Sequence, residues 1–433
     1  MELIVVIAVI GILAGVVIVG YGSWRDNSLK SAMQSDLKQA ASQVDSNNTW
    51  STSQSYANDD LNSGTAFSPS NGTQITFFRR SYGYCLLATN PRTTTVFSYK
   101  NSTKTVSEGT CDVTVSTFAG SGASGSSDGT GTAAQFNNPY TGAIDSAGNI
   151  YIADLGNNLI RKMTPSGTVT TVAGSGVAGY ADGPALSAQF NQPRGIAVSP
   201  TGDLYVSDAY NQRIRKISLT TGQVTTLAGS GATGTTDGVG TAAQFSYPEE
   251  LVVNASGTIF LVDSNNSRIR QITPDGTVTT LAGSTAGFAD GTGTAAKFNY
   301  PRGIVLDKSN NLYVTDYTNN RIRKVTPSGV VTTIAGSGVA GSTDGQGTAA
   351  QLNGPYGISI DSYGVLYITD LNINKIRLIT PTYAVTTMAG STMGYADGAG
   401  TAAQFNVPRG VISDKSGVLY VVDSFNNRIR KIE

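Results

Sequence analysis

Six positions in this 433-residue chain combine charge, hydrogen-bonding groups and aromatic rings at one point of a sequence repeat. Each follows a proline that recurs through the second part of the chain, and the six are Tyr140, Arg194, Glu249, Arg302, Tyr356 and Arg409. Because arginine and glutamate form charge-assisted hydrogen bonds and tyrosine stacks on rings, the six could hold a sugar or a peptide. The alternative is that the six residues form a solvated rim without a shared function, at which the residue type varies by ordinary sequence drift.

The same residues are poorly suited to catalysis. The chain contains no histidine, which removes the commonest general base and the commonest zinc ligand. Glu249 and Glu250 are adjacent, and neighbours in a strand point to opposite faces, so they make a poor acid–base pair. The recurring Asp-Gly loops carry one carboxylate each, without a second at ligand spacing for calcium. We therefore expect a protein that is not an enzyme and that needs no metal or cofactor.

The elements that must position the six residues are copies of one repeat. An aspartate before glycine marks each copy, at intervals of 53–55 residues: Asp128, Asp182, Asp237, Asp290, Asp344 and Asp397. Each copy contains four short segments rich in Val, Ile, Tyr and Thr, separated by Gly, Pro, Asn and Asp. That pattern is typical of a four-stranded blade.

The two ends of the repeat array fit together. The chain finishes at 428–432, the third strand of the last copy, whereas 113–119 matches the fourth strand. Residues 113–119 could therefore complete the last blade and remove the open edges. The sequence predicts an all-β six-bladed β-propeller over 112–433, closed by its first strand, rather than an open solenoid.

The repeat resembles the NHL family of six-bladed propellers, through loops such as GYADG and lines such as LYVSDAYNQRIRKI. The members of that family that do chemistry rely on metal-binding histidines, which this chain lacks. Members that bind RNA use a basic face, whereas the formal net charge here is zero, so we expect no nucleic-acid partner.

Two further features of the repeat are expected to be structural. The pairs Asp208–Arg213, Asp316–Arg321 and Asp423–Arg428 recur at one phase. They could form a ligand-binding ring, but the simpler interpretation is that the carboxylate ties a turn and the arginine packs across it. Residues 132–136 are expected to form a Thr-capped helical turn that buries Phe136.

The N-terminal segment carries one charge, Glu2, ahead of an apolar stretch over 3–21. As a helix this stretch would be about 28 Å long, close to the hydrocarbon thickness of a membrane. Leu29, Met33, Leu37, Ala40 and Val44 continue the helical spacing, so residues 1–46 predict one helix, apolar first and amphipathic afterwards. An isolated acid in apolar surroundings needs a partner, which predicts contact with another chain.

The run ELIVVIAVIGILA resembles the N-terminal segment of type IV pilins and pseudopilins. The resemblance implies that Glu2 pairs with the N-terminal amine of a neighbouring subunit and that Gly11 matches the family's glycine. It also implies a homo-oligomeric helical filament outside the cell, anchored in the inner membrane before assembly. Two departures are the single residue before Glu2, where the family has four, and Val19 in place of a helix-breaking proline. Gly20 and Gly22 could allow local melting there instead.

Residues 47–111 predict a small α/β head between the helix and the propeller. Short strand-like segments lie at 75–78, 84–89, 94–100 and 104–113. Cys85 and Cys111 permit one intramolecular pairing, which in an exported protein favours a disulfide over two buried thiols. The arrangement around these cysteines resembles the disulfide-closed heads of some bacterial pilins.

These features predict a structural subunit of a pilus-like filament that displays a propeller for adhesion or ligand binding. The alternatives are a minor pilin or pseudopilin, at a filament tip or in a secretion machine, and a membrane-tethered binding propeller that does not polymerise.

Overall fold

The computed structural model describes residues 27–42, 73–80, 83–90, 97–100, 105–108, 113–414 and 417–433. The chain divides into two compact units, Met1–Cys111 and Asp112–Glu433. The predicted assembly residues Glu2, Gly11, Gly20 and Gly22, together with Cys111, lie outside the described residues. The roles assigned to them, including the Cys85–Cys111 disulfide, stay predictions.

The first unit contains a helix over residues 27–42. It buries one stripe of side chains, among them Leu29, Met33, Leu37 and Ala40, whose spacing of three and four places them on one face. The rest of the helix expected over 1–46 lies outside the described residues. Within the described ranges, no helix is long and apolar enough to cross a membrane.

A four-stranded antiparallel sheet belongs to the same unit. Its order is β1 (Gln74–Arg80), β2 (Gly83–Thr89), β3 (Phe97–Lys100) and β4 (Thr105–Glu108). Consecutive strands are neighbours, and the register pairs Cys85 of β2 with Phe78 of β1 and Lys100 of β3. Ile75, Leu86 and Phe97 are buried. The likeness of this unit to a pilin head stays a prediction.

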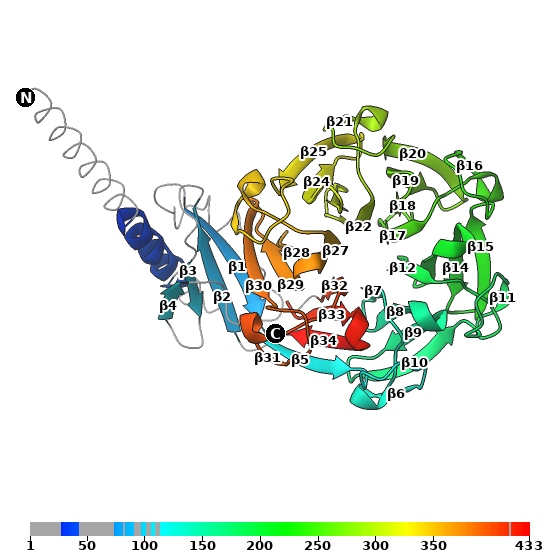
Figure 1. Cartoon of the computed structure of the whole chain (residues 1–433), viewed down its shortest axis with the longest axis horizontal. Helices are drawn as coiled ribbons and strands as arrows, with labels where there is room; N and C mark the ends of the chain where they lie inside the picture. Colours follow the sequence, from blue (N-terminus) through cyan, green and yellow to red (C-terminus); the bar gives the residue numbers. More distant parts are fainter. Residues whose placement is uncertain are drawn as a thin grey trace, which may run out of the picture. The chain divides into compact units, whose positions relative to one another are not determined.

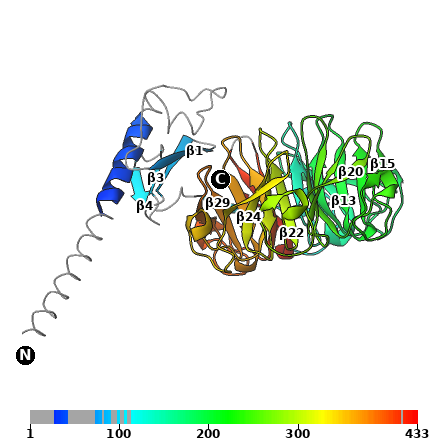
Figure 2. The same cartoon turned by 90° about the horizontal axis from the view of Figure 1, so that it is seen from above.

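The second unit is a ring of six five-stranded antiparallel sheets, so the predicted six-bladed propeller is confirmed (Figure 1). Turned by 90°, the blades form a disc (Figure 2). In each blade four strands follow one another as a meander from the axis outward. The innermost strands are β7 (Gly142–Ile144), β12 (Pro193–Val198), β17 (Pro248–Val253), β22 (Pro301–Leu306), β27 (Pro355–Ile360) and β32 (Pro408–Ser413).

The next two strands of each blade form a hairpin. The second strands are β8 (Ile150–Asp154), β13 (Leu204–Asp208), β18 (Ile259–Asp263), β23 (Leu312–Asp316), β28 (Leu366–Asp370) and β33 (Leu419–Asp423). The third strands are β9 (Leu159–Met163), β14 (Arg213–Ser218), β19 (Arg268–Ile272), β24 (Arg321–Val325), β29 (Lys375–Ile379) and β34 (Arg428–Ile432). Every second strand is buried along its whole length.

The fourth strands confirm the predicted closure of the ring. In five blades they follow the third strand in sequence: β10 (Thr168–Ala173), β15 (Gln223–Ala228), β20 (Thr277–Gly283), β25 (Val330–Ala335) and β30 (Ala384–Ala389). In the last blade the place is taken by β5 (Thr114–Ala119), which pairs with β34. The two ends of the propeller chain therefore share one sheet, and β34 is not left as an unpaired edge strand.

Each blade also has a two-residue outer strand that the sequence did not predict. These strands are β6 (Gly129–Thr130), β11 (Gly183–Pro184), β16 (Gly238–Val239), β21 (Gly291–Thr292), β26 (Gly345–Gln346) and β31 (Gly398–Ala399). Two residues are too few to show the alternation by which a strand is recognised in a sequence.

The turn after β6 corrects one prediction. Residues Gly131–Ala133 form a single 3₁₀ turn, but its N-terminal flanking residue Thr130 makes no side-chain cap, and Thr132 is exposed. The predicted Thr cap is therefore wrong. The backbone enters the turn from an extended strand, and Thr130 instead lies within hydrogen-bonding distance of Thr168 across the sheet, at 3.2 Å. The predicted burial of Phe136 is confirmed.

A repeated ion pair that was not predicted from the sequence holds each blade, and it uses the arginine two residues after the one that packs across the turn. Arg215 is fully buried and donates to Asp208 at 2.7 Å and to the loop aspartate Asp182 at 2.5 Å. Arg213 lies directly opposite Asp208 in register, yet it donates to backbone carbonyls and stacks on Tyr180. Asp208 thus bonds its diagonal neighbour, a contact that long side chains can make across a sheet.

The same buried pairing recurs in all six blades, with distances of 2.6–2.9 Å to the second-strand aspartate. The six arginines are Arg161, Arg215, Arg270, Arg323, Arg377 and Arg430. Their second partners are the Asp-Gly aspartates, at 2.5–2.7 Å. The recurring acids and arginines are thus occupied with one another inside the blades, as the structural interpretation expected.

Candidate functional site

The six candidate residues lie at one end of the central channel, where the innermost strands begin. In blades two to six the register shifts just after the recurring proline, for example between Pro193 and Ile196. Such a bulge bends a strand and redirects its side chains. The structure brings Tyr140, Arg194, Glu249, Arg302, Tyr356 and Arg409 together there, and we call this set the mouth.

Glu249 is the centre of the mouth. It is almost fully buried, at 1% exposure, and its Oε1 accepts a hydrogen bond from Arg194 Nη1 at 2.8 Å and another from Arg302 Nη1. Its Oε2 accepts the Tyr140 hydroxyl at 2.6 Å. Two guanidinium groups and a phenol thus satisfy one buried carboxylate, which is the condition for placing such a charge inside a protein.

The tyrosines complete the network. The Tyr140 hydroxyl accepts a hydrogen bond from Arg194 Nη1 at 2.5 Å and also contacts the Tyr356 hydroxyl. Their rings meet edge to face, with centroids 5.8 Å apart. Burial raises the pKa of both phenols, so they are neutral hydrogen-bonding groups at physiological pH.

Arg409 differs from the other two mouth arginines. Its Nη1 donates to the neutral amide oxygen of Asn138 at 2.9 Å, and its guanidinium lies over the Tyr140 ring at 5.0 Å. Within the described part of the chain, no carboxylate forms an ion pair with it. The mouth therefore carries three guanidinium groups and one carboxylate.

The three arginines belong to alternate blades. Arg194, Arg302 and Arg409 start the innermost strands of blades two, four and six, whereas Tyr140, Glu249 and Tyr356 occupy blades one, three and five. The propeller therefore has a pseudo-threefold pattern at its mouth, which Glu249 breaks. The pattern is readable in the sequence as a two-blade period.

Aromatic side chains surround the mouth, and sequence reasoning missed them. They are Tyr210, Tyr247, Tyr300, Tyr317 and Phe425, which we call the aromatic collar. Arg194 lies over Tyr247 at 4.1 Å, Arg302 over Tyr317 at 5.5 Å and Arg409 over Phe425 at 5.4 Å. Tyr210, Tyr300 and Phe425 are 49%, 43% and 54% exposed, so their rings are accessible to a ligand.

Two collar tyrosines have an unfavourable backbone conformation. Tyr247 and Tyr300 each precede the recurring proline and adopt the left-handed region, with φ of 60° and 49°. For a residue with a bulky side chain this conformation costs roughly 1–2 kcal/mol. A tyrosine before proline in two neighbouring repeats was the signal that could have revealed the collar.

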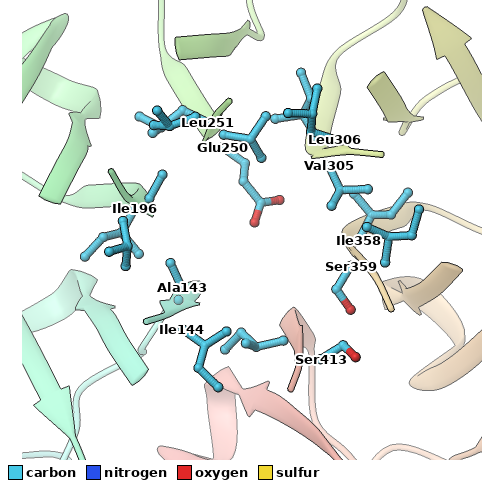
Figure 3. Close-up of a pocket in the computed structure, with 18 of the residues that line it drawn as sticks. Ala143, Ile144, Ile196, Glu250, Leu251, Val305, Leu306, Ile358, Ser359 and Ser413 are labelled. Carbon is cyan, nitrogen blue, oxygen red and sulfur yellow. The ribbon is translucent and has the colours of Figure 1, made fainter. Parts of the chain in front are cut away.

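The Glu250 side chain is not part of the mouth network and extends into the central channel (Figure 3). Its Oε1 accepts the Thr141 hydroxyl at 2.9 Å, and the backbone N–H of Ile304 donates to the same carboxyl. Burial raises the pKa of Glu250 to about 8, and the nearby Glu249 adds to the effect. The two adjacent glutamates thus have different surroundings.

Metal ligation finds no support in the described residues, which contain no group of three Cys, Asp or Glu side chains that could hold an ion. The Asp-Gly aspartates bond arginines instead. The absence of a metal or cofactor nevertheless stays a prediction.

Comparison with known proteins agrees with the blade architecture. The family model described as NHL repeat matches residues 190–217 and 298–325, which cover the inner three strands of blades two and four. Two blades of this propeller therefore match the NHL repeat. Human NHL repeat-containing protein 2 is 29% identical over 326 residues, covering 66% of this chain and 44% of that protein.

Two other proteins are similar to this chain, one in sequence and one in fold. The chloroplastic protein SUPPRESSOR OF QUENCHING 1 of Arabidopsis thaliana is 30% identical over 278 residues, covering 60% of this chain and 26% of that protein. The chain thus spans less than half the length of either curated relative. An auxiliary nutrient binding protein from Bacteroides ovatus superposes with a TM-score of 0.58 at 18% identity, covering 83% of this chain and 88% of that one. That likeness shows the fold alone.

Proposed function

We propose that this NHL propeller is a binding module whose mouth holds an acidic sugar. The observation that carries the proposal is Arg409, a guanidinium that faces a neutral amide and two aromatic rings. A ligand carboxylate would supply the missing negative charge through a charge-assisted, bidentate pair. The exposed collar rings would stack on the sugar. A similar fold in a protein described as nutrient binding is compatible with this role.

The proposal is tested by binding the full chain to an array of acidic and neutral oligosaccharides and acidic peptides. We expect selective binding to acidic sugars and at least a tenfold loss for Arg409→Gln. The matched control is Arg213→Gln, because Arg213 also stacks on an aromatic ring, 3.8 Å from the centroid of Tyr180, but belongs to a third strand. An equal loss in both variants, or binding to neutral sugars alone, would contradict the proposal. Binding to acidic peptides alone would identify a protein ligand instead.

We also propose that the chain is a subunit of a type IV pilus-like filament on the cell surface. The support is the sequence: Glu2 ahead of the apolar segment 3–21, followed by an amphipathic helix that includes the described residues 27–42. In this arrangement the N-terminal segments would form the filament core and the propeller would be displayed for adhesion.

Glu2→Ala tests the filament proposal, because it removes the acid that would pair with a neighbouring subunit. Electron microscopy of sheared appendages should show no filaments, while circular dichroism shows an intact propeller. Normal filaments from this variant would contradict the proposal. Counting copies along a filament separates a major subunit from a minor pilin. Strictly single molecules in lipid would support the membrane-tethered alternative.

A further inference from the structure

A cavity of about 300 Å³ lies in the central channel, lined by the innermost strands of all six blades (Figure 3). Its lining is aliphatic apart from three polar side chains, Glu250, Ser359 and Ser413. The volume is at the lower end of the range for small-molecule sites, and an apolar wall with few polar groups is their usual composition.

Four other blades have glycine at the position equivalent to Glu250, so they place no side chain in this part of the channel. The residue after the mouth position is Glu250 in blade three, Thr141 in blade one and glycine in the remaining four. At Gly303 an added Cβ would lie 2.4 Å from the Tyr356 carbonyl oxygen and 3.0 Å from Glu250 Oε2. Side chains are thus excluded where neighbouring strands approach closely, and a single carboxyl group extends into the opening.

Glu250 has no counter-charge on the cavity side. Among the described residues that line the cavity it is the only ionisable one, and the mouth arginines Arg194 and Arg302 bond Glu249 instead. Burial and the neighbouring Glu249 favour the protonated form, which is why the pKa is raised to about 8. A cation beside the carboxyl group would reverse that preference.

Ser359 supplies a second polar group to the cavity, and its hydroxyl is not hydrogen-bonded to any described residue. Its residue is 8% exposed, and its hydroxyl oxygen has no hydrogen-bond partner within the described structure. Leaving a buried hydroxyl unpaired is unfavourable, so a ligand that hydrogen-bonds to it is stabilised. The Ser359 hydroxyl can accept or donate a hydrogen bond, whereas the ionised Glu250 carboxylate only accepts and repels an anion.

We propose that the channel binds a primary ammonium group carried on a short aliphatic chain, with Glu250 as its counter-charge. The ammonium has three hydrogen-bond donors, and the Glu250 carboxylate and the Ser359 hydroxyl, which line the same cavity, both accept hydrogen bonds. The alkyl chain would pack against aliphatic side chains such as Ile196, Leu251 and Ile358. On binding, Glu250 loses its proton to solvent and the ion pair forms between carboxylate and ammonium.

The test is calorimetric titration of the full chain with n-butylammonium at pH 7, with n-butanol and butyrate as matched probes. We expect butylammonium to bind at least tenfold more tightly than either probe. Titration in buffers of different ionisation enthalpy should show release of close to one proton. Between pH 6 and 8 the affinity should rise, because less free energy is spent on deprotonating Glu250.

Glu250→Gln is the decisive variant, because it keeps the shape and the acceptor for Thr141 but removes the charge. It should lose at least tenfold in affinity and all of the proton release. Arg213→Gln, on the third strand β14 and away from the cavity lining, is the control and should bind butylammonium unchanged. Nα-acetyl-lysine N-methylamide distinguishes the sources: tighter binding than butylammonium indicates a protein lysine, and weaker binding indicates a free amine. Absence of butylammonium binding, or equal binding by Glu250→Gln, overturns the proposal and leaves the acidic-sugar site untouched.

Discussion

Glu249 and Glu250 are adjacent in sequence but belong to two different electrostatic environments. Glu249 is buried among two arginines and a tyrosine hydroxyl, which together satisfy its charge. Glu250 extends into an aliphatic channel, where its described donors are the Thr141 hydroxyl and one backbone N–H. Two acids that are adjacent in sequence can therefore differ in the number and charge of their hydrogen-bond donors.

The mouth and the cavity, which belong to the same central channel, also differ in their side chains. The mouth is rich in guanidinium groups and aromatic rings, whereas the cavity lining is aliphatic with one carboxyl group. The two proposals accordingly assign an anionic ligand to the mouth and a cationic ligand to the cavity. The following substitutions and pH titration test that difference, in order of decreasing expected effect.

Glu249→Leu should destabilise the propeller by about 3–5 kcal/mol, because it leaves Arg194 and Arg302 buried without their shared carboxylate. The measurement is the free energy of unfolding by urea, followed by circular dichroism at pH 7. Glu250→Leu is the matched control. A loss no larger than that of the control would show that the mouth network does not stabilise the fold.

The raised pKa of Glu250 should be visible in the pH dependence of the free energy of unfolding. The folded state keeps its proton up to about pH 8, whereas the unfolded state loses it near the ordinary glutamate pKa. Folded protein therefore binds more protons in this window, and stability falls as the pH rises from about 4.5 to 8, by at most about 1.4 kcal/mol per pH unit.

Subtracting the same curve for Glu250→Gln isolates this contribution. The blade aspartates, of which burial raises the pKa of Asp154 and Asp370 to about 6, are common to both proteins and cancel. Parallel curves for wild type and variant would mean that Glu250 titrates normally.

Glu250→Leu should stabilise the propeller by about 1–2 kcal/mol at pH 8, because an acid without a counter-charge is replaced by an aliphatic side chain. The sign is opposite to that for Glu249→Leu. Thermal unfolding at pH 8 measures it, and destabilisation would show that Glu250 is better satisfied than its hydrogen bonds indicate.

Thr141→Val should have the smallest effect, a loss of about 0.5–1.5 kcal/mol, because it removes one hydrogen bond to Glu250 at nearly constant shape. It should also raise the pKa of Glu250 further, since the Thr141 hydrogen bond lowers it. Carbon-detected NMR titration of the Glu250 carboxyl group measures the midpoint. A midpoint that stays in place would exclude Thr141 as its donor.

Much of the propeller was predictable, because its information is local and repeated. The six copies, their four main strands and the closing role of residues 113–119 follow from spacing and β-propensity, and the structure places β5 there. The ion-pair partner of Asp208 could not be read from the sequence, because there are two candidates, Arg213 and Arg215. Backbone register favours the first, whereas the side chains select the second.

The mouth was predictable only as a set of residue types at a shared repeat position. The sequence placed six variable residues after the recurring proline, but it could not show that Arg194 and Arg302 converge on Glu249 from different blades. It also missed the aromatic collar, whose members come from two kinds of loop, the one before the innermost strand and the one after the second strand. These contacts depend on how blades are arranged around an axis, which local patterns do not encode.

The sequence by itself determined the repeat, the strand content, the closure of the ring and the presence of an apolar N-terminal segment, because these depend on hydrophobic periodicity and turn residues. Only the tertiary structure decided which charges meet. Electrostatic interaction falls with distance and depends on desolvation, and both quantities are fixed when the six blades close around the channel. That closure gives Glu249 two counter-charges, whereas Glu250 has none among the residues that the structure describes.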